Sequence, residues 1–265
     1  MLESLPPAAR TDLEVDRLGG TVVTDAGDHL VVRTPDNPGY HWGNFVQVTS
    51  GDSDDVERWL ALFAEHFPTA RHRAFGLARP SSCPEVWGSH GLAADDVEAL
   101  TATRSPSPTP VPQGYTVRTL QEEDEWEQRL AAELAENAAS GEHPANEYAE
   151  FMRQDHLVRR RLQAAGTARW IGAFTGDGAL AASLGMVDLD GRARYQSVLT
   201  APEHRRRGLA RHLLAVAADW AVERGAAEIV IVAEADSDAG RLYRRAGFAP
   251  GPLSHGWYAP SWPVT

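Results

Sequence analysis

After residue 114, segments with the hydrophobic pattern of strands are interspersed with segments that have the pattern of helices. Apolar, often β-branched runs predict strands at residues 115–120, 168–174, 179–187, 194–199, 227–232 and 255–258. Apolar residues at helical spacing predict an amphipathic helix that contains Leu209, Leu213, Val216, Ala217 and Trp220. Two helices are expected between the first two strands and one before the last. The resulting order, β-α-α-β-β-β-α-β-α-β, predicts a mixed α/β sheet.

Helix boundaries can be placed from capping signals. Thr119 and Glu122 have the spacing of a capping box, and the acidic run 122–127 suits the first turn of a helix. The second helix is expected at 147–165, with the arginines at 159–161 partly solvated. Asp236 is the expected N-cap of the last helix, and Gly247 its end.

The first half of the chain has a similar but less regular pattern. Strands are expected at 29–32, 42–48 and 73–77. A helix is expected at 54–67, with its inward face formed by Val56, Trp59, Leu60 and Phe63. Residues 95–103 are assigned to a helix or a tail. This order could be a degenerate copy of the fold that follows it.

Composition divides the chain into three parts. Residues 104–113 are rich in Pro, Ser and Thr and lack apolar periodicity, so they predict a linker. We therefore expect an N-terminal α/β domain at 1–103 and a second α/β domain at 114–265.

Charge and composition exclude several classes of function. The net charge of −12 argues against nucleic-acid binding, although it is compatible with a cationic or amine substrate. The chain has no lysine, which excludes Schiff-base and phosphate-loop lysine chemistry. Cys83 is the only cysteine, no apolar run is long enough for a membrane span, and no signal peptide is expected. These features predict a cytoplasmic protein that does not bind membranes.

The turn before Leu209 has the composition of an anion site. Arg205, Gly208 and Ala210 form the pattern Arg-x-x-Gly-x-Ala between a strand and a helix. A helix N-terminus presents unpaired N–H groups and partial positive charge, and small residues let a phosphate approach the backbone. Arg206, Arg207 and Arg211 add charge, so the turn suits a pyrophosphate.

A second motif follows the strand at 227–232. Asp236, Ala239, Tyr243, Gly247 and Phe248 lie on and just after a predicted short helix. Together the two segments resemble the GNAT N-acetyltransferase superfamily, whose motifs are Arg/Gln-x-x-Gly-x-Gly/Ala and Asn-x-x-Ala-x-x-x-Tyr-x-x-x-Gly-Phe. Asp236 stands where the family has Asn, which removes a hydrogen-bond donor near the coenzyme.

The resemblance implies a GNAT acyltransferase fold at 114–265, an additional N-terminal α/β domain, and acetyl-CoA as co-substrate. It implies that the strand ending at Leu199 is splayed from the next, with the Val198 N–H facing the acetyl carbonyl. The implied coenzyme contacts are Val198, Leu199, Thr200, Arg205, Arg206, Arg207, Gly208, Leu209, Ala210, Arg211, Asp236 and Tyr243.

Acyl transfer to an amine needs a proton acceptor for the amine and a donor for the leaving thiolate. The resemblance makes Tyr243 the candidate acid. The strand 194–198 has no Glu, and Glu234 is therefore the candidate base, acting directly or through water. No metal is expected, because the histidines lack metal-ligand spacing.

The sequence therefore predicts an acetyl-CoA-dependent N-acetyltransferase that moves an acetyl group directly to a primary amine in a ternary complex. The acceptor is a small molecule or a peptide amine, recognised around residues 136–161 and the C-terminal strands. The N-terminal half is expected to cover that pocket or to mediate dimerisation, so a homodimer is possible. The alternative is a non-catalytic acyl-CoA-binding regulatory or interaction module.

Overall fold

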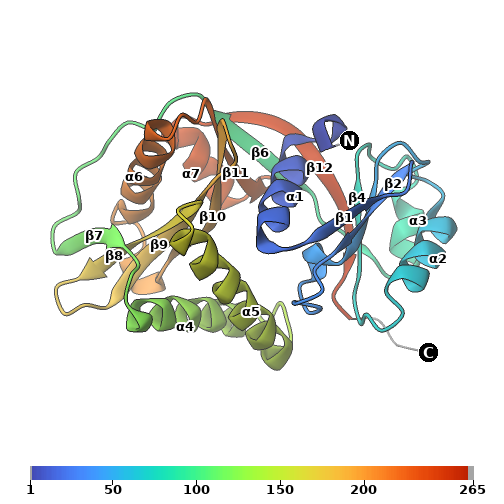
Figure 1. Ribbon diagram of the computed structural model, residues 1–265, viewed down its shortest axis with the longest axis horizontal. Helices are drawn as coiled ribbons and strands as arrows, with labels where there is room; N and C mark the ends of the chain where they lie inside the picture. The colour runs from blue at the N-terminus through green and yellow to red at the C-terminus, as the bar shows by residue number, and fades with distance from the viewer. Residues whose placement is uncertain (1, 262–265) are drawn as a thin grey trace. The chain divides into compact units, whose positions relative to one another are not determined.

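The structure is a computed structural model that describes residues 2–261 (Figure 1). Its contacts divide the chain into two compact units. One contains the described residues up to Ala99, the segment Ala233–Ser237 and the described residues from Gly251 onward. The other contains Leu100–Val232 and Asp238–Pro250. None of the helices formed by residues 2–261 combines the length and apolarity needed to cross a membrane.

The second unit is built on a mixed sheet. Its strands are β7 (Tyr115–Thr119), β8 (Ala168–Thr175), β9 (Leu180–Asp188), β10 (Arg192–Thr200) and β11 (Glu228–Glu234). Neighbours from β7 to β10 pair antiparallel, whereas β10 and β11 pair in parallel. The parallel ladder joins Arg192–Arg194 to Glu228–Val230 and ends there, although both strands continue. The second half of β10 therefore diverges from β11, as the sequence analysis expected.

Helices cover both faces of this sheet (Figure 1). They are α4 (Glu123–Ser140), α5 (Ala145–Ala164), α6 (Leu209–Glu223) and α7 (Asp238–Ala246), with a 3-10 turn at Pro202–His204. The pair α4 and α5 lies on one face, and α6 packs on the other against β8, β9 and β10. Apolar side chains fill the space under α6, as its sequence pattern predicts; the fully buried ones include Leu184, Met186, Tyr195, Leu213 and Leu214.

Two local predictions in this unit are wrong in detail. The capping box of α4 is formed by Glu122 and Glu125 rather than by Thr119 and Glu122. Glu125 accepts hydrogen bonds from the Gln121 and Glu122 amides and is also held by Arg118, which explains why an acidic side chain can be buried there. The last helix begins at Asp238, so Asp236 lies two residues before it, with a left-handed φ of 61°, and is not its N-cap.

The first unit contains further strands and helices. Its strands are β1 (Val22–Asp25), β2 (His29–Arg33), β3 (Phe45–Val48), β4 (Arg73–Leu77), the short β5 (Ala93–Ala94), the start of β6 (Val97–Ala102) and most of β12 (Ala249–Ala259). Its helices are α1 (Pro7–Gly19), α2 (Val56–His66) and α3 (Pro84–Ser89), with 3-10 turns at Leu2–Ser4 and His41–Gly43. The predicted inward face of α2 is confirmed, since all its residues are buried.

Residues 97–102 correct the prediction of a helix or tail at 95–103, because they form strand β6. Ala99 and Leu100 at its centre are fully buried. The last strand, β12, pairs antiparallel with β4, with His255 opposite Leu77 and Ala259 opposite Arg73. The described residues from Gly251 onward cluster with the first unit, whereas the sequence-based boundary at 114–265 assigns them to the second.

Candidate functional site

A bulge interrupts strand β10 where it diverges from β11. In the ladder with β9, Gln196 lies opposite Gly185, but Leu199 lies opposite Ser183, so β10 contains one extra residue. Ser197 carries the distortion, with a left-handed φ of 46°. Residues other than glycine seldom adopt this conformation, and it tends to persist where surrounding contacts enforce it. The bulge turns the backbone of 197–200 away from regular pairing.

The turn after β10 leads directly into α6. Gly208 is the N-cap residue, with φ 85°, and Arg206 also has a positive φ of 59°. A Cβ added to Gly208 would meet no atom within 4 Å, so glycine is required by the backbone conformation rather than by crowding. The side chains of Arg206 and Arg211 are exposed. An open, cationic helix N-terminus of this kind can hold an anion.

Arg205 of the predicted pyrophosphate turn has protein partners. Its Nε donates to the Thr200 carbonyl at 3.0 Å, and its guanidinium lies 3.4 Å from the Glu136 carboxylate of α4. Arg207 donates to the Glu203 carbonyl in the same turn. Arg205 therefore links the end of β10 to α4 and helps shape the turn. Of the other predicted contacts, Leu209 and Leu199 are buried in the core and can offer only backbone groups.

Tyr243 projects from α7 into the second unit and is buried. Its ring meets Phe248 edge-on, with the centroids 6.4 Å apart. Burial raises the pKa of the Tyr243 phenol to about 12, although the nearby Arg194 guanidinium acts in the opposite direction. The phenol is therefore neutral at pH 7 and available as a hydrogen-bond donor.

Glu234 is the last residue of β11, Asp236 follows the strand, and both are exposed. Both belong to the segment Ala233–Ser237, which clusters with the first unit, whereas Tyr243 belongs to the second. The proposed roles of Glu234 as base and Asp236 as coenzyme contact stay predictions.

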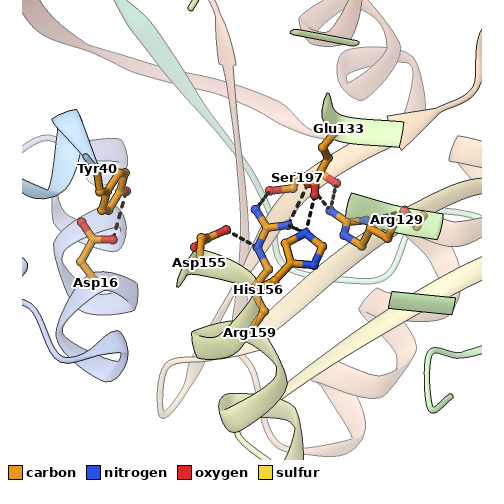
Figure 2. A network of polar contacts seen from close by, with 9 residues as sticks. Asp16, Tyr40, Arg129, Glu133, Asp155, His156, Arg159 and Ser197 are labelled. Atoms are coloured by element: carbon orange, nitrogen blue, oxygen red, sulfur yellow. Dashed lines mark hydrogen bonds and ion pairs between the residues drawn. The ribbon is translucent and has the colours of Figure 1, made fainter. Parts of the chain in front are cut away.

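A buried polar network that sequence analysis missed joins α4 and α5 to the bulge (Figure 2). Its centre is Glu133 of α4, which accepts hydrogen bonds from Arg129 at 3.0 Å and from Arg159 of α5 at 2.8 Å. His156 Nε2 lies 2.6 Å from the other Glu133 oxygen. Arg129 donates to the Ser197 carbonyl, and Arg159 to the Ser197 hydroxyl, both at 2.9 Å.

The charges in this network balance. Arg159 Nε lies 2.5 Å from Asp155, so two guanidinium groups face two carboxylates. Burial alone would raise the pKa of Glu133, but the guanidinium groups of Arg129 and Arg159 hold it far below its ordinary value. Burial lowers the pKa of Arg129 to about 10, which leaves it charged at pH 7.

The protonation of His156 follows from this balance. Burial lowers the pKa of its ring, and the Arg159 charge acts in the same direction, although Glu133 opposes them. The ring is therefore neutral at pH 7. Because ionised Glu133 can only accept, Nε2 carries the proton and Nδ1 has the lone pair.

The sequence contains a signal for this network. Arg129 and Glu133 are four residues apart and lie on the same helical face as Trp126, which is buried. His156 and Arg159 likewise share a face with the buried Met152. Charged residues on the apolar side of two neighbouring helices indicate a buried ionic network. The expectation that Arg159 is partly solvated is thus wrong.

A hollow of about 600 Å³ lies in another part of the second unit. Its lining includes Trp126, Arg160, Arg169, Trp220 and Arg224. Trp220 and Arg224 mark the C-terminal end of α6, one helix length from the turn at Gly208. None of the predicted coenzyme-binding or catalytic residues lines it.

Comparisons with known proteins agree with this geometry. Residues 122–248 match the model of the "Acetyltransferase (GNAT) family". No curated protein matches the sequence.

Solved structures show a similar fold over nearly the whole chain. A GCN5-related N-acetyltransferase from Kribbella flavida is 19% identical with a TM-score of 0.63, and the match covers 97% of each chain. One from Sphaerobacter thermophilus is 19% identical with a TM-score of 0.57, covering 98% of this chain and 93% of that one.

A tandem GNAT protein from the clavulanic acid biosynthesis pathway is 16% identical with a TM-score of 0.56. The match covers 94% of this chain and 88% of that one. The fold predicted from the sequence, a GNAT-like mixed α/β fold with an additional N-terminal α/β domain, is confirmed by these likenesses. Residues 122–248 of this chain are thus similar to the acetyltransferase (GNAT) family, whose model they match.

Proposed function

We propose that the protein is an N-acetyltransferase that moves the acetyl group of acetyl-CoA directly to a primary amine in a ternary complex. The observation that carries the proposal is the distorted second half of β10. Its ladder with β11 ends at Arg194, its bulge lies at Ser197, and it continues into a cationic helix N-terminus at Gly208. One continuous segment thus offers backbone beyond the end of the β11 ladder for an extended thiol arm and an anion site for the pyrophosphate of the coenzyme.

In this proposal, different residues of the chain bind the coenzyme, stabilise the developing negative charge and transfer the protons. Backbone groups of Val198 and Thr200 hold the pantetheine arm, and the Val198 N–H donates to the thioester oxygen as negative charge develops. The amine nitrogen attacks the carbonyl carbon, the C–S bond breaks, and the thiolate receives a hydrogen bond and then a proton from Tyr243. The amine proton passes to Glu234, directly or through water.

The raised pKa of Tyr243 keeps its phenol protonated, so it can donate a hydrogen bond, but it also makes the phenol a reluctant proton donor. A phenol that gives up its proton reluctantly also fits the alternative, a non-catalytic acyl-CoA-binding module. An enzyme and a binding module both hold the coenzyme, and only the enzyme releases free thiol when an amine is added.

Calorimetric titration tests the coenzyme site first. We expect saturable binding of acetyl-CoA and CoA to the full-length protein, with ATP much weaker. Thiol release is then measured with a panel of small primary amines and peptide amines. Release with at least one amine supports the enzyme, whereas tight coenzyme binding without release supports the binding module. If neither coenzyme binds, the proposed function is wrong.

A further inference from the structure

We propose that Arg129 and Arg159 are positioning residues that hold Ser197 in its left-handed conformation and thereby aim the backbone N–H of Val198. The role given to Val198 rests on the proposed function. We call the contacts of Arg129 and Arg159 with Ser197 the clamp. It lies within the second unit, where residues of two helices contact the same bulge residue (Figure 2). No strand residue supplies these contacts.

The carbonyl contact sets the direction of the Val198 N–H. The Ser197 carbonyl and the Val198 N–H belong to one planar, trans peptide unit, so they point in opposite directions. Arg129, on α4, donates to that carbonyl at 2.9 Å. The N–H of the same peptide is therefore directed away from the Arg129 guanidinium.

The same contact strengthens the N–H as a donor. A cation that binds a carbonyl oxygen polarises the whole amide, and hydrogen bonds in such a chain reinforce one another. Arg129 is fully buried, and its pKa of about 10 keeps it charged at pH 7. The Val198 N–H thus meets a developing oxyanion with more positive charge than an ordinary backbone amide.

Arg129 also bridges the strands at the point where their ladder is irregular. A second nitrogen of its guanidinium donates to the Ser183 hydroxyl on β9. Ser183 lies opposite Leu199, immediately beyond the bulge. The guanidinium therefore joins β9 to β10 across the extra residue and replaces the regular backbone pairing that the bulge interrupts.

Arg159 completes the clamp from α5. It donates to the Ser197 hydroxyl at 2.9 Å, while Glu133 and Asp155 fix its own position at 2.8 Å and 2.5 Å. Glu133 also holds Arg129, so a single carboxylate aligns both guanidinium groups. Because both arginines are buried and paired, the bulge is preorganised before any ligand binds.

Two substitutions at Ser197 distinguish the effect of losing the left-handed backbone conformation from the effect of losing the hydroxyl contact with Arg159. Ser197→Ala and Ser197→Gly both remove the hydroxyl that Arg159 holds, but only glycine adopts a positive φ without strain. We expect kcat to fall about tenfold or more in Ser197→Ala and to stay within about threefold of wild type in Ser197→Gly. The affinity for acetyl-CoA, measured by calorimetry, should change much less than kcat. Equal losses of kcat in the two variants would overturn the proposal.

The role of Arg159 is tested by asking whether a second substitution restores the activity that Arg159→Gln loses. Arg159→Gln should lower kcat, and adding Ser197→Gly to it should restore most of the loss, because glycine needs less help to keep the bulge. Arg224→Gln is the control, since Arg224 is an exposed arginine that pairs with Asp188 and belongs to none of the predicted sites. It should leave kcat unchanged. A loss in Arg159→Gln that the glycine does not restore marks Arg159 as merely structural.

A readout without turnover distinguishes the failure of this proposal from the failure of the proposed function. The order parameter of the Val198 N–H, measured by ¹⁵N relaxation, should be that of a rigid backbone in wild type and Ser197→Gly. It should fall in Ser197→Ala and Arg159→Gln. If wild type binds no acetyl-CoA but these differences appear, the clamp exists and the function is wrong. If wild type is active and the order parameters are all equal, the clamp is wrong.

Discussion

Glu133 Oε2 lies 2.6 Å from His156 Nε2, and this contact joins α4 to α5 in the interior of the second unit. The carboxylate is ionised and the ring is neutral, because burial and the two neighbouring guanidinium groups disfavour a third cation. The network therefore tolerates Glu133 only as an anion and His156 only as a neutral ring. Stability must depend on pH for this reason.

Acidification should destabilise the protein. The pKa of His156 is lower in the folded state than its ordinary value of 6.5, so the unfolded chain binds that proton first and stability falls as the pH drops below about 6.5. The lowered pKa of Glu133 adds a further loss as the pH drops below about 4.5. Thermal unfolding between pH 8 and pH 4 measures both. His156→Gln should flatten the part of the curve between pH 7 and pH 5, and an unchanged slope there would assign the effect to other groups.

Removing the central carboxylate should be costly. Glu133→Leu leaves Arg129 and Arg159 buried with less compensating charge, and breaking a buried ion pair from one side costs about 3–5 kcal/mol. Chemical denaturation measures the loss. Glu136→Leu is the control, because Glu136 is on the same helix but exposed, and its ion pair with Arg205 should be worth about 1 kcal/mol or less. Similar losses for the two variants would show that the network contributes little.

Much of the framework could be predicted from the sequence because its signals are local. The inward face of α2 follows from helical spacing, and the apolar run at 73–77 predicts a strand with the bounds that the structure shows. The divergence of β10 from β11 was implied by the family resemblance and agrees with a ladder that ends at Arg194.

The remaining features depend on tertiary contacts. Residues 97–102 contain alanine and glutamate, which favour helices, but burial of Ala99 and Leu100 in a sheet overrides that propensity. The clamp on Ser197 was missed because its members lie on three elements, and the arginine at 159 sits in a run of three that resembles a solvated face.

Tyr243→Phe should separate chemistry from coenzyme binding. General acid catalysis contributes typically about 100-fold or more, so we expect kcat to fall by that order while the calorimetric affinity for acetyl-CoA stays within about threefold. Tyr195→Phe is a matched control within the same unit, because the Tyr195 hydroxyl donates to the Leu214 carbonyl of α6 at 2.5 Å. That variant should lose about 1 kcal/mol of stability without a selective loss of kcat. Full activity in Tyr243→Phe would leave the phenol a purely structural role.

Gly208→Ala should weaken anion binding at the N-terminus of α6 by changing the backbone conformation there, without a steric clash. No atom lies within 4 Å of the added methyl group, but φ 85° is unfavourable for alanine, so the turn should lose about 1–2 kcal/mol. The helix N-terminus would relax toward a negative φ, its N–H groups would lose their alignment, and the affinity for acetyl-CoA should fall about tenfold.

Gly178 provides the matched control for this change. It lies in the hairpin between β8 and β9 with φ 90° and equally open surroundings. Gly178→Ala should show the same loss of thermal stability with unchanged coenzyme affinity. If both variants bind acetyl-CoA as wild type does, the conformation at Gly208 serves only to start α6 and the pyrophosphate must bind elsewhere.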